Sequence, residues 1–280
     1  DWTRDLMVEY PKFNIVGEEW SPNPAITSYW QMGKQNHDGY ISYLPSLMDF
    51  PLQIAFVEAL NDDFGWGKGF IKAYQMLAND FLYADPYNLV IFPDNHDMTR
   101  FYTQVYNDLD LFNMGIVYFA TMRGIPQFFY GTEILMNSNK SPGNHGLIRS
   151  DFPGGFPGDK INAFTTEGLN VDQIKTLDFF KKLLNWRKSN EVIHHGKLIQ
   201  FAPKMAGWDE IYSYFRIHNN KKVWVLFNRG NHTQEVEMER YKELIKDYTH
   251  GYEILTDQTI DLEKGILMEG KSSLIIELNP

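Results

Sequence analysis

Residues 88–100 read NLVIFPDNHDMTR, an apolar run that ends abruptly in charged and polar side chains. The run 88–92 is typical of a strand that is buried on both faces. It is followed by two carboxylates, an imidazole and a guanidinium, which belong to Asp94, Asp97, His96 and Arg100. A loop that only has to meet water does not need this concentration of reactive groups. The stretch therefore predicts a buried strand that carries functional side chains at its carboxyl end.

The composition is that of an ordinary globular protein with an acidic balance. The chain has 280 residues, of which 43% are hydrophobic and 22% charged, enough for one large domain or two smaller ones. The net charge of −10 and the pI near 5.3 argue against a nucleic-acid surface. No apolar run approaches the roughly 18 residues that a membrane-spanning helix needs. Cysteine is absent, so disulfides and thiolate chemistry are excluded.

Two parts of the chain differ in their hydrophobic pattern. Over residues 1–192, short apolar runs alternate with helical periodicity, which predicts parallel strands joined by right-handed helical crossovers. The predicted strands are 13–16, 47–50, 88–92 and 125–130, and the predicted helices are 71–83, 109–122 and a last one ending near Lys188. Over residues 193–280 the pattern changes to β-rich alternation with turn residues, which predicts an all-β domain.

Acidic side chains follow three of the predicted strands, because the first runs into Glu18, the third into Asp97 and the fourth into Glu133. In a parallel α/β barrel the carboxyl ends of all strands face one mouth, so these groups would converge. Carboxylates that flank one bond are the working parts of glycoside hydrolysis. The alternative is that each acidic residue caps the helix behind it. That alternative suits any single carboxylate, but it does not explain Glu18, His96 and Asp97 together.

Three motifs resemble those of the α-amylase superfamily of glycoside hydrolases. VGEEW at 16–20 resembles the strand-five motif, FPDNHD at 92–97 the strand-seven motif, and GIPQFFYGTEI at 124–134 the strand-eight signature. The segment IRSDFPGGFPGDKINAF at 148–164 is similar to the neopullulanase and cyclomaltodextrinase branch, especially its Bacteroidetes-type members. The resemblance implies the second half of a (β/α)8 barrel over residues 1–192 and a β-sandwich over residues 193–280.

The resemblance implies a role for each matched polar residue. Glu18 falls on the general acid/base, Asp97 on the carboxylate that stabilises the transition state, and His96 on a group that binds a sugar hydroxyl. Since neighbouring side chains of a strand point to opposite faces, only one of Glu18 and Glu19 can face the mouth. The family's pattern selects Glu18.

Four other residues near these motifs have weaker implications. Trp20 is expected to form an aromatic contact surface at the rim of the site for a sugar on the leaving-group side. Arg149 is expected either to contact a sugar on the glycone side or to form a surface ion pair. Asp94 falls on a variable position of the family, and Arg100 is interpreted as a structural ion-pair partner in the loop.

One part of the family's pattern is missing. The motif Gly-x-Arg-x-Asp, which carries the nucleophile of these retaining enzymes, does not occur in the chain, and neither does the earlier Asp-x-x-x-Asn-His motif. Arg4 and Asp5 are adjacent and do not lie on an apolar strand, so they do not replace it. The expectation is therefore the C-terminal portion of a longer enzyme. Alone it should be inactive and should associate with the missing half of the barrel or with itself.

Three functions agree with these motifs. The first is part of a retaining hydrolase acting on α-1,4-glucosidic bonds of cyclodextrin, pullulan, starch or maltooligosaccharides. The second is another α-glucosidase or a transglycosylase of the same superfamily, and the third a non-catalytic module that binds glycans or a protein. No cofactor is expected, although the resemblance allows calcium with ligands upstream of residue 1. It also suggests a periplasmic or otherwise extracytoplasmic location.

Overall fold

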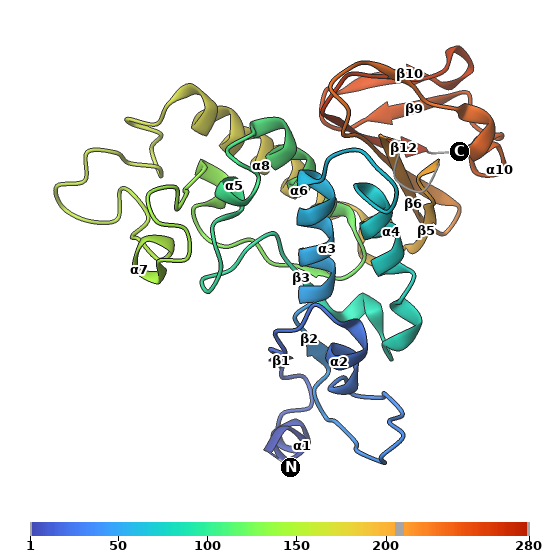
Figure 1. Ribbon diagram of the computed structural model, residues 1–280. Helices are drawn as coiled ribbons and strands as arrows, with labels where there is room; N and C mark the ends of the chain where they lie inside the picture. The colour runs from blue at the N-terminus through green and yellow to red at the C-terminus, as the bar shows by residue number, and fades with distance from the viewer. Residues whose placement is uncertain (1, 205–209, 279–280) are drawn as a thin grey trace.

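The computed structural model describes residues 2–204 and 210–278. Figure 1 shows a helix-rich part with few and very short strands, from which a β domain projects at the C-terminal end. The two parts meet along the helices of the first part, while the N-terminal helix α1 (Trp2–Glu9) lies at the opposite end of the molecule. Among the described residues, no helix is long and apolar enough to cross a membrane.

Four short parallel strands form the frame of the first part. They are β1 (Val16–Gly17), β2 (Ser46–Leu47), β3 (Val90–Ile91) and β4 (Ile125–Pro126). β1 pairs with β2, a single parallel bridge joins Met48 to Val90, and β3 pairs with β4. The strands therefore lie side by side in the order in which they occur along the chain, with all their carboxyl ends at one edge. This is the arrangement of consecutive strands in a (β/α)8 barrel.

The ladders are shorter than the sequence predicts, and in β2 the cause is a polar residue that begins the next helix. The backbone N–H of Asp49 donates to the carbonyl of Val90 at 2.8 Å, and the Asp49 carboxylate then caps the next helix by accepting from the N–H of Leu52 at 3.1 Å. The predicted strand 47–50 is thus a strand of two residues followed by a helix start. In β4, Pro126 has no N–H to contribute to a ladder.

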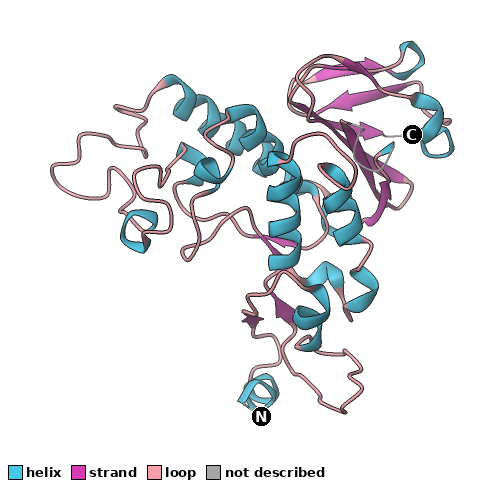
Figure 2. Cartoon of the chain, in the orientation of Figure 1, coloured by secondary structure: helices cyan, strands magenta, loops and turns pink. Residues whose placement is uncertain are grey.

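Helices connect and cover these strands, and most begin at a capping residue. The capping carboxylate of Asp108 accepts from the N–H groups of Asp110 and Leu111, while Asn170 and Gln173 form a reciprocal capping box. The helices are α2 (Pro24–Tyr29), α3 (Phe50–Asn61), α4 (Phe70–Leu77), α5 (Phe101–Gln104), α6 (Leu109–Thr121), α7 (His145–Ile148), α8 (Val171–Ser189) and α9 (Glu191–His195). The segment between β4 and α8 consists mainly of loop (Figure 2).

The C-terminal part is a β domain of two antiparallel sheets. Its six-stranded sheet has the order β10-β9-β12-β7-β6-β5, and its two-stranded sheet pairs β11 with β8. The bounds are β5 (Lys197–Phe201), β6 (Ile211–His218), β7 (Lys221–Asn228), β8 (Gln234–Glu235), β9 (His250–Glu253), β10 (Gln258–Asp261), β11 (Leu267–Met268) and β12 (Ser272–Leu278), with the short helix α10 (Lys242–Ile245). Alternate side chains of β6 and β7 face opposite sides of the sheet, so Phe215 and Trp224 stack in a core within the β domain.

The opposite face of the same sheet contributes to the core of the first part. Tyr212, Tyr214 and Phe227 belong to one buried cluster with Phe56 of α3 and Tyr118 of α6. A buried arginine reinforces this contact, since Arg216 of β6 donates to the carbonyls of Gly196 and Thr121. The β domain is therefore joined to the helices through a shared hydrophobic core.

Candidate active site

The candidate site lies at the edge where the parallel strands end. Glu18 directly follows β1, and His96 and Asp97 lie on the loop after β3. Since β1 and β3 run parallel within the strip of strands β1 to β4, these residues lie at the carboxyl edge of that strip. Glu18 is exposed and Glu19 is half-buried. The topology thus brings the predicted acid/base and the predicted stabiliser to the same edge from two different strands.

Trp20 lies beside this edge on an aromatic support. Its ring stacks on that of Phe50, the first residue of α3, with centroids 4.5 Å apart and an angle of 24° between the ring planes. Phe50 is fully buried, whereas Trp20 is 48% exposed. One face of the indole is therefore held by the protein while part of the ring stays in contact with solvent, as a stacking surface for a sugar requires.

Asp97 is the most heavily contacted of the predicted site residues. One carboxylate oxygen, Oδ1, forms an ion pair with Arg149 and lies 3.4 Å from Nδ1 of His145. The other oxygen, Oδ2, lies 3.2 Å from Nε2 of His96. The Asp97 backbone N–H donates to Oδ1 of Asn95 at 2.8 Å, which fixes the turn that presents the carboxylate. The imidazole of His96 is 58% exposed, so it remains accessible to a ligand.

The loop that carries His96 and Asp97 is anchored by two buried charged residues. Asp94 accepts from the N–H of Phe101 at 2.7 Å. Arg100 donates to the carbonyls of Ile148 and Tyr130, and its guanidinium carbon lies 4.0 Å from the ring centroid of Phe129. The structural role predicted for Arg100 agrees with this placement, but the type of partner differs from the prediction. An ion pair was predicted, whereas the guanidinium contacts two carbonyl groups and an aromatic ring.

Burial raises the pKa of Asp94 to about 6, against the opposing effect of the hydrogen bond from Phe101. A carboxyl group whose pKa is higher in the folded than in the unfolded state contributes stability below its unfolded pKa of about 4, and that contribution is lost as the pH rises through 6. We therefore expect Asp94 to lower the free energy of unfolding of the wild type by about 2–3 kcal/mol between pH 4 and pH 7. Asp94→Asn should lack this decrease, because the amide does not titrate.

Urea unfolding at several pH values, with the difference between the variant and the wild type taken at each pH, measures this effect. Asp178→Asn is the matched control, because Asp178 is exposed on α8. A wild-type curve and an Asp94→Asn curve that stay parallel from pH 4 to pH 7 would show that Asp94 titrates normally.

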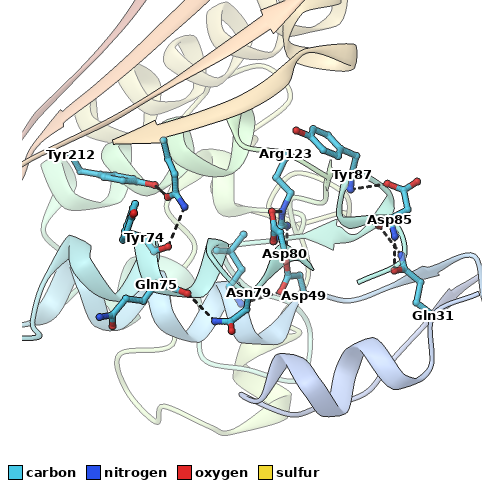
Figure 3. A network of polar contacts seen from close by, with 12 residues as sticks. Gln31, Asp49, Tyr74, Gln75, Asn79, Asp80, Asp85, Tyr87, Arg123 and Tyr212 are labelled. Carbon is cyan, nitrogen blue, oxygen red and sulfur yellow. Dashed lines mark hydrogen bonds and ion pairs between the residues drawn. The ribbon is translucent and has the colours of Figure 1, made fainter. Parts of the chain in front are cut away.

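Asp49 and Glu133, the other carboxylates at the strand ends, differ in accessibility. Asp49 is buried and its Oδ2 accepts from Nη1 of Arg123 at 2.7 Å, while Arg123 also binds Asp80 through Nη2 and Nε (Figure 3). This buried pairing leaves Asp49 no path to a substrate. Glu133, in a 3₁₀ turn (Thr132–Ile134), is half-buried and lines a groove against α8.

His145 is a site residue that the sequence reasoning missed. It lies on α7, one helical turn before Arg149, and the two side chains approach Asp97 together. The spacing of four between His145 and Arg149 was the available signal, because residues at i and i+4 share a helix face. Within residues 2–204 and 210–278, no group of three or more histidine and acidic side chains is arranged to hold a metal ion.

Four parallel strands that lie side by side, with Glu18, His96 and Asp97 after their carboxyl ends, have the arrangement of part of a (β/α)8 barrel. Residues 1–153 match the family model described as the alpha amylase catalytic domain, and residues 198–277 match the cyclo-malto-dextrinase C-terminal domain. The chain belongs to the α-amylase family.

Relatives and solved structures agree with this assignment. The chain is 28% identical over 225 residues to a cyclomaltodextrin glucanotransferase of Thermoanaerobacterium thermosulfurigenes, covering 78% of this chain and 28% of the relative. It is 26% identical over 225 residues to an alpha-amylase of Niallia circulans, covering 78% of this chain and 37% of the relative. The alpha-amylase of Geobacillus thermoleovorans complexed with acarbose superposes with a TM-score of 0.73 at 20% identity, covering 100% of this chain and 56% of that one. The chain thus spans about a third of the length of these curated relatives.

Proposed function

We propose that these residues form part of a retaining glycoside hydrolase that acts on α-glucans. The observation that carries the proposal is the convergence of Glu18 with His96 and Asp97 at the carboxyl edge of one parallel strip. In this proposal Glu18 protonates the glycosidic oxygen as the bond breaks and later activates the incoming water. Asp97 stabilises the positive charge that develops on the sugar ring.

The remaining predicted residues hold the sugar chain in place. His96, whose imidazole is exposed beside Asp97, binds a hydroxyl of the sugar at the scissile bond. Trp20 stacks on the sugar of the leaving side. The covalent intermediate of a retaining enzyme needs a carboxylate nucleophile. We propose that a carboxylate from outside these 280 residues supplies it, because the Gly-x-Arg-x-Asp motif is absent from them.

The substrate class follows from the two family matches. The match to a cyclo-malto-dextrinase C-terminal domain favours cyclic and linear maltodextrins as substrates. Cyclomaltodextrin glucanotransferases among the relatives favour a second candidate function, transglycosylation. The two reactions share the glycosyl-enzyme intermediate and differ only in whether water or a sugar hydroxyl resolves it.

The test compares the 280-residue polypeptide alone with a joined protein, in which the missing half of the barrel, including the strand that carries the nucleophile, is fused to it. We expect the joined protein to release reducing sugar from cyclodextrin, pullulan or starch with retention of the α-configuration, and the polypeptide alone to release none. We also expect the polypeptide alone to associate, because β1 and β4 each have one unpaired edge among the described residues. Its mass in solution checks this second point.

Two results would contradict the proposal in different ways. Robust hydrolysis by a monomeric sample of the polypeptide alone would mean that one of its own carboxylates is the nucleophile, and Glu133 would be the first to substitute. If the joined protein folds but cleaves no α-glucan, the function itself is wrong. Product analysis by thin-layer chromatography separates hydrolysis from transfer.

A further inference from the structure

Arg149 is placed to act on Asp97 as well as on a ligand. Its Nη2 forms an ion pair with Oδ1 of Asp97, and its Nε donates to the carbonyl of His96 at 2.9 Å. One guanidinium thus contacts the side chain of the predicted stabiliser and the backbone of the residue before it. A planar group that binds two points of one turn restricts both the position and the rotation of the carboxylate.

The backbone on both sides of Arg149 is held to the protein. Ile148 is fully buried, and its carbonyl accepts from Nε of Arg100 at 2.9 Å. The carbonyl of Ser150 accepts from the hydroxyl of Tyr130 at 2.9 Å. Although the segment between β4 and α8 is long and mostly loop, the residue that reaches Asp97 is therefore fixed at its base (Figure 2).

His145 adds a second contact from the same turn. Its Nδ1 lies 3.0 Å from Nη2 of Arg149 and 3.4 Å from Oδ1 of Asp97. His145 and Nη2 of Arg149 therefore both approach Oδ1 of Asp97, while Oδ2 faces His96. Oδ1 of Asp97 is thus held by His145 and Arg149, whereas Oδ2 lies on the side of the imidazole that is proposed to bind the substrate.

We infer that Arg149 is a positioning residue that keeps the carboxylate of Asp97 oriented for the transition state, an inference that rests on the proposed function. Stabilisation of a developing positive charge requires a carboxylate whose orientation is set before the reaction. An aspartate side chain in an exposed loop has rotational freedom, and the ion pair with Arg149 removes it. The segment around α7 thereby acts on turnover through Asp97, beyond any contact it makes with the glycan.

The experiment is Arg149→Met in the joined protein described above, with kcat and KM measured on a maltooligosaccharide. We expect kcat to fall about 10- to 100-fold, the scale of a misplaced catalytic group, while KM changes less than about threefold because ground-state contacts are kept. Arg149→Lys should recover part of the kcat, since it restores the charge without the planar fork. Guanidinium added to the Arg149→Met assay should also restore part of it.

Arg4→Met is the matched control, because the side chain of Arg4 is as exposed as that of Arg149, at 46%, and is paired with Asp5 on α1. We expect this control to leave kcat and KM unchanged. A rise in KM at constant kcat for Arg149→Met would make Arg149 a sugar contact and would overturn the positioning role, while leaving the proposed function intact. Unchanged kcat and KM would overturn it as well. Failure of the proposed function shows separately, as a lack of α-glucan cleavage by the unsubstituted protein.

Discussion

Glu18→Gln in the joined protein is expected to lower kcat by about 10²- to 10⁴-fold, the usual contribution of a positioned general acid/base. The amide cannot deliver the proton that the leaving oxygen needs in the transition state. Oligosaccharide binding should change little, because ground-state affinity comes from many hydroxyl contacts and from the half-exposed ring of Trp20. Single-turnover kinetics and calorimetric titration with a maltooligosaccharide measure the two quantities separately.

Glu19→Gln is the control, because it makes the same chemical change one position along the chain. Because Glu19 is half-buried whereas Glu18 is exposed where β1 ends, it should leave kcat within about threefold of the wild type. The opposite result, with Glu19→Gln inactive and Glu18→Gln fully active, would show that the neighbouring carboxylate is the acid/base. Near wild-type activity of both variants would rule out an acid on this strand.

Arg123→Met is expected to lower the free energy of unfolding by about 3–5 kcal/mol, the cost of leaving buried charges without their partner. Arg123 is 1% exposed and binds the carboxylates of Asp49 and Asp80 at 2.7 and 2.6 Å. Burial already raises the pKa of Asp80, and Arg123 is the group that opposes this rise. Without the guanidinium, both carboxylates must either stay charged in a buried site or take up protons. Urea unfolding at neutral pH followed by circular dichroism measures the loss.

Lys182→Met is the control for this prediction, since Lys182 and Asp257 form an ion pair at 2.6 Å that is open to solvent. Its removal should cost less than about 1 kcal/mol. A triple variant with Arg123→Met, Asp49→Asn and Asp80→Asn should be more stable than Arg123→Met alone, because it removes the unpaired charges. Equal stability of Arg123→Met and the wild type would mean that the pairing adds nothing beyond the desolvation it costs.

Motif order and hydrophobic pattern were sufficient to predict the architecture. The apolar run 88–92 followed by His96 and Asp97 indicated a parallel strand with functional residues at its carboxyl end, and β3 lies there. The alternation after residue 193 indicated an all-β domain, and β6, β7 and β12 lie in that part of the chain. These features are local, because a strand or a helix face repeats within a few residues and a motif places its side chains at a fixed distance from a strand end.

Strand length was less predictable than strand position. The predicted strand 125–130 is reduced to Ile125–Pro126, and the predicted strand 13–16 is replaced by Val16–Gly17. Apolar side chains continue beyond both ladders, yet Phe13 and Tyr130 are exposed, at 53% and 40%. An apolar pattern therefore does not by itself indicate how far a hydrogen-bonded strand extends.

The sequence by itself determined which residues stand at the strand ends, the order of the strands and the change to a β domain. Only the tertiary structure decided what surrounds them. Arg149 and Asp97 are 52 positions apart, and Arg123 and Asp49 are 74 apart, so no periodicity links the members of either pair. The first contact arises because parallel strands bring separate loops to one edge. The second joins two buried side chains, each of which needs a partner for its charge. The local hydrophobic pattern therefore determines whether a segment forms a strand or a helix, whereas the contacts between charged side chains depend on how distant elements pack.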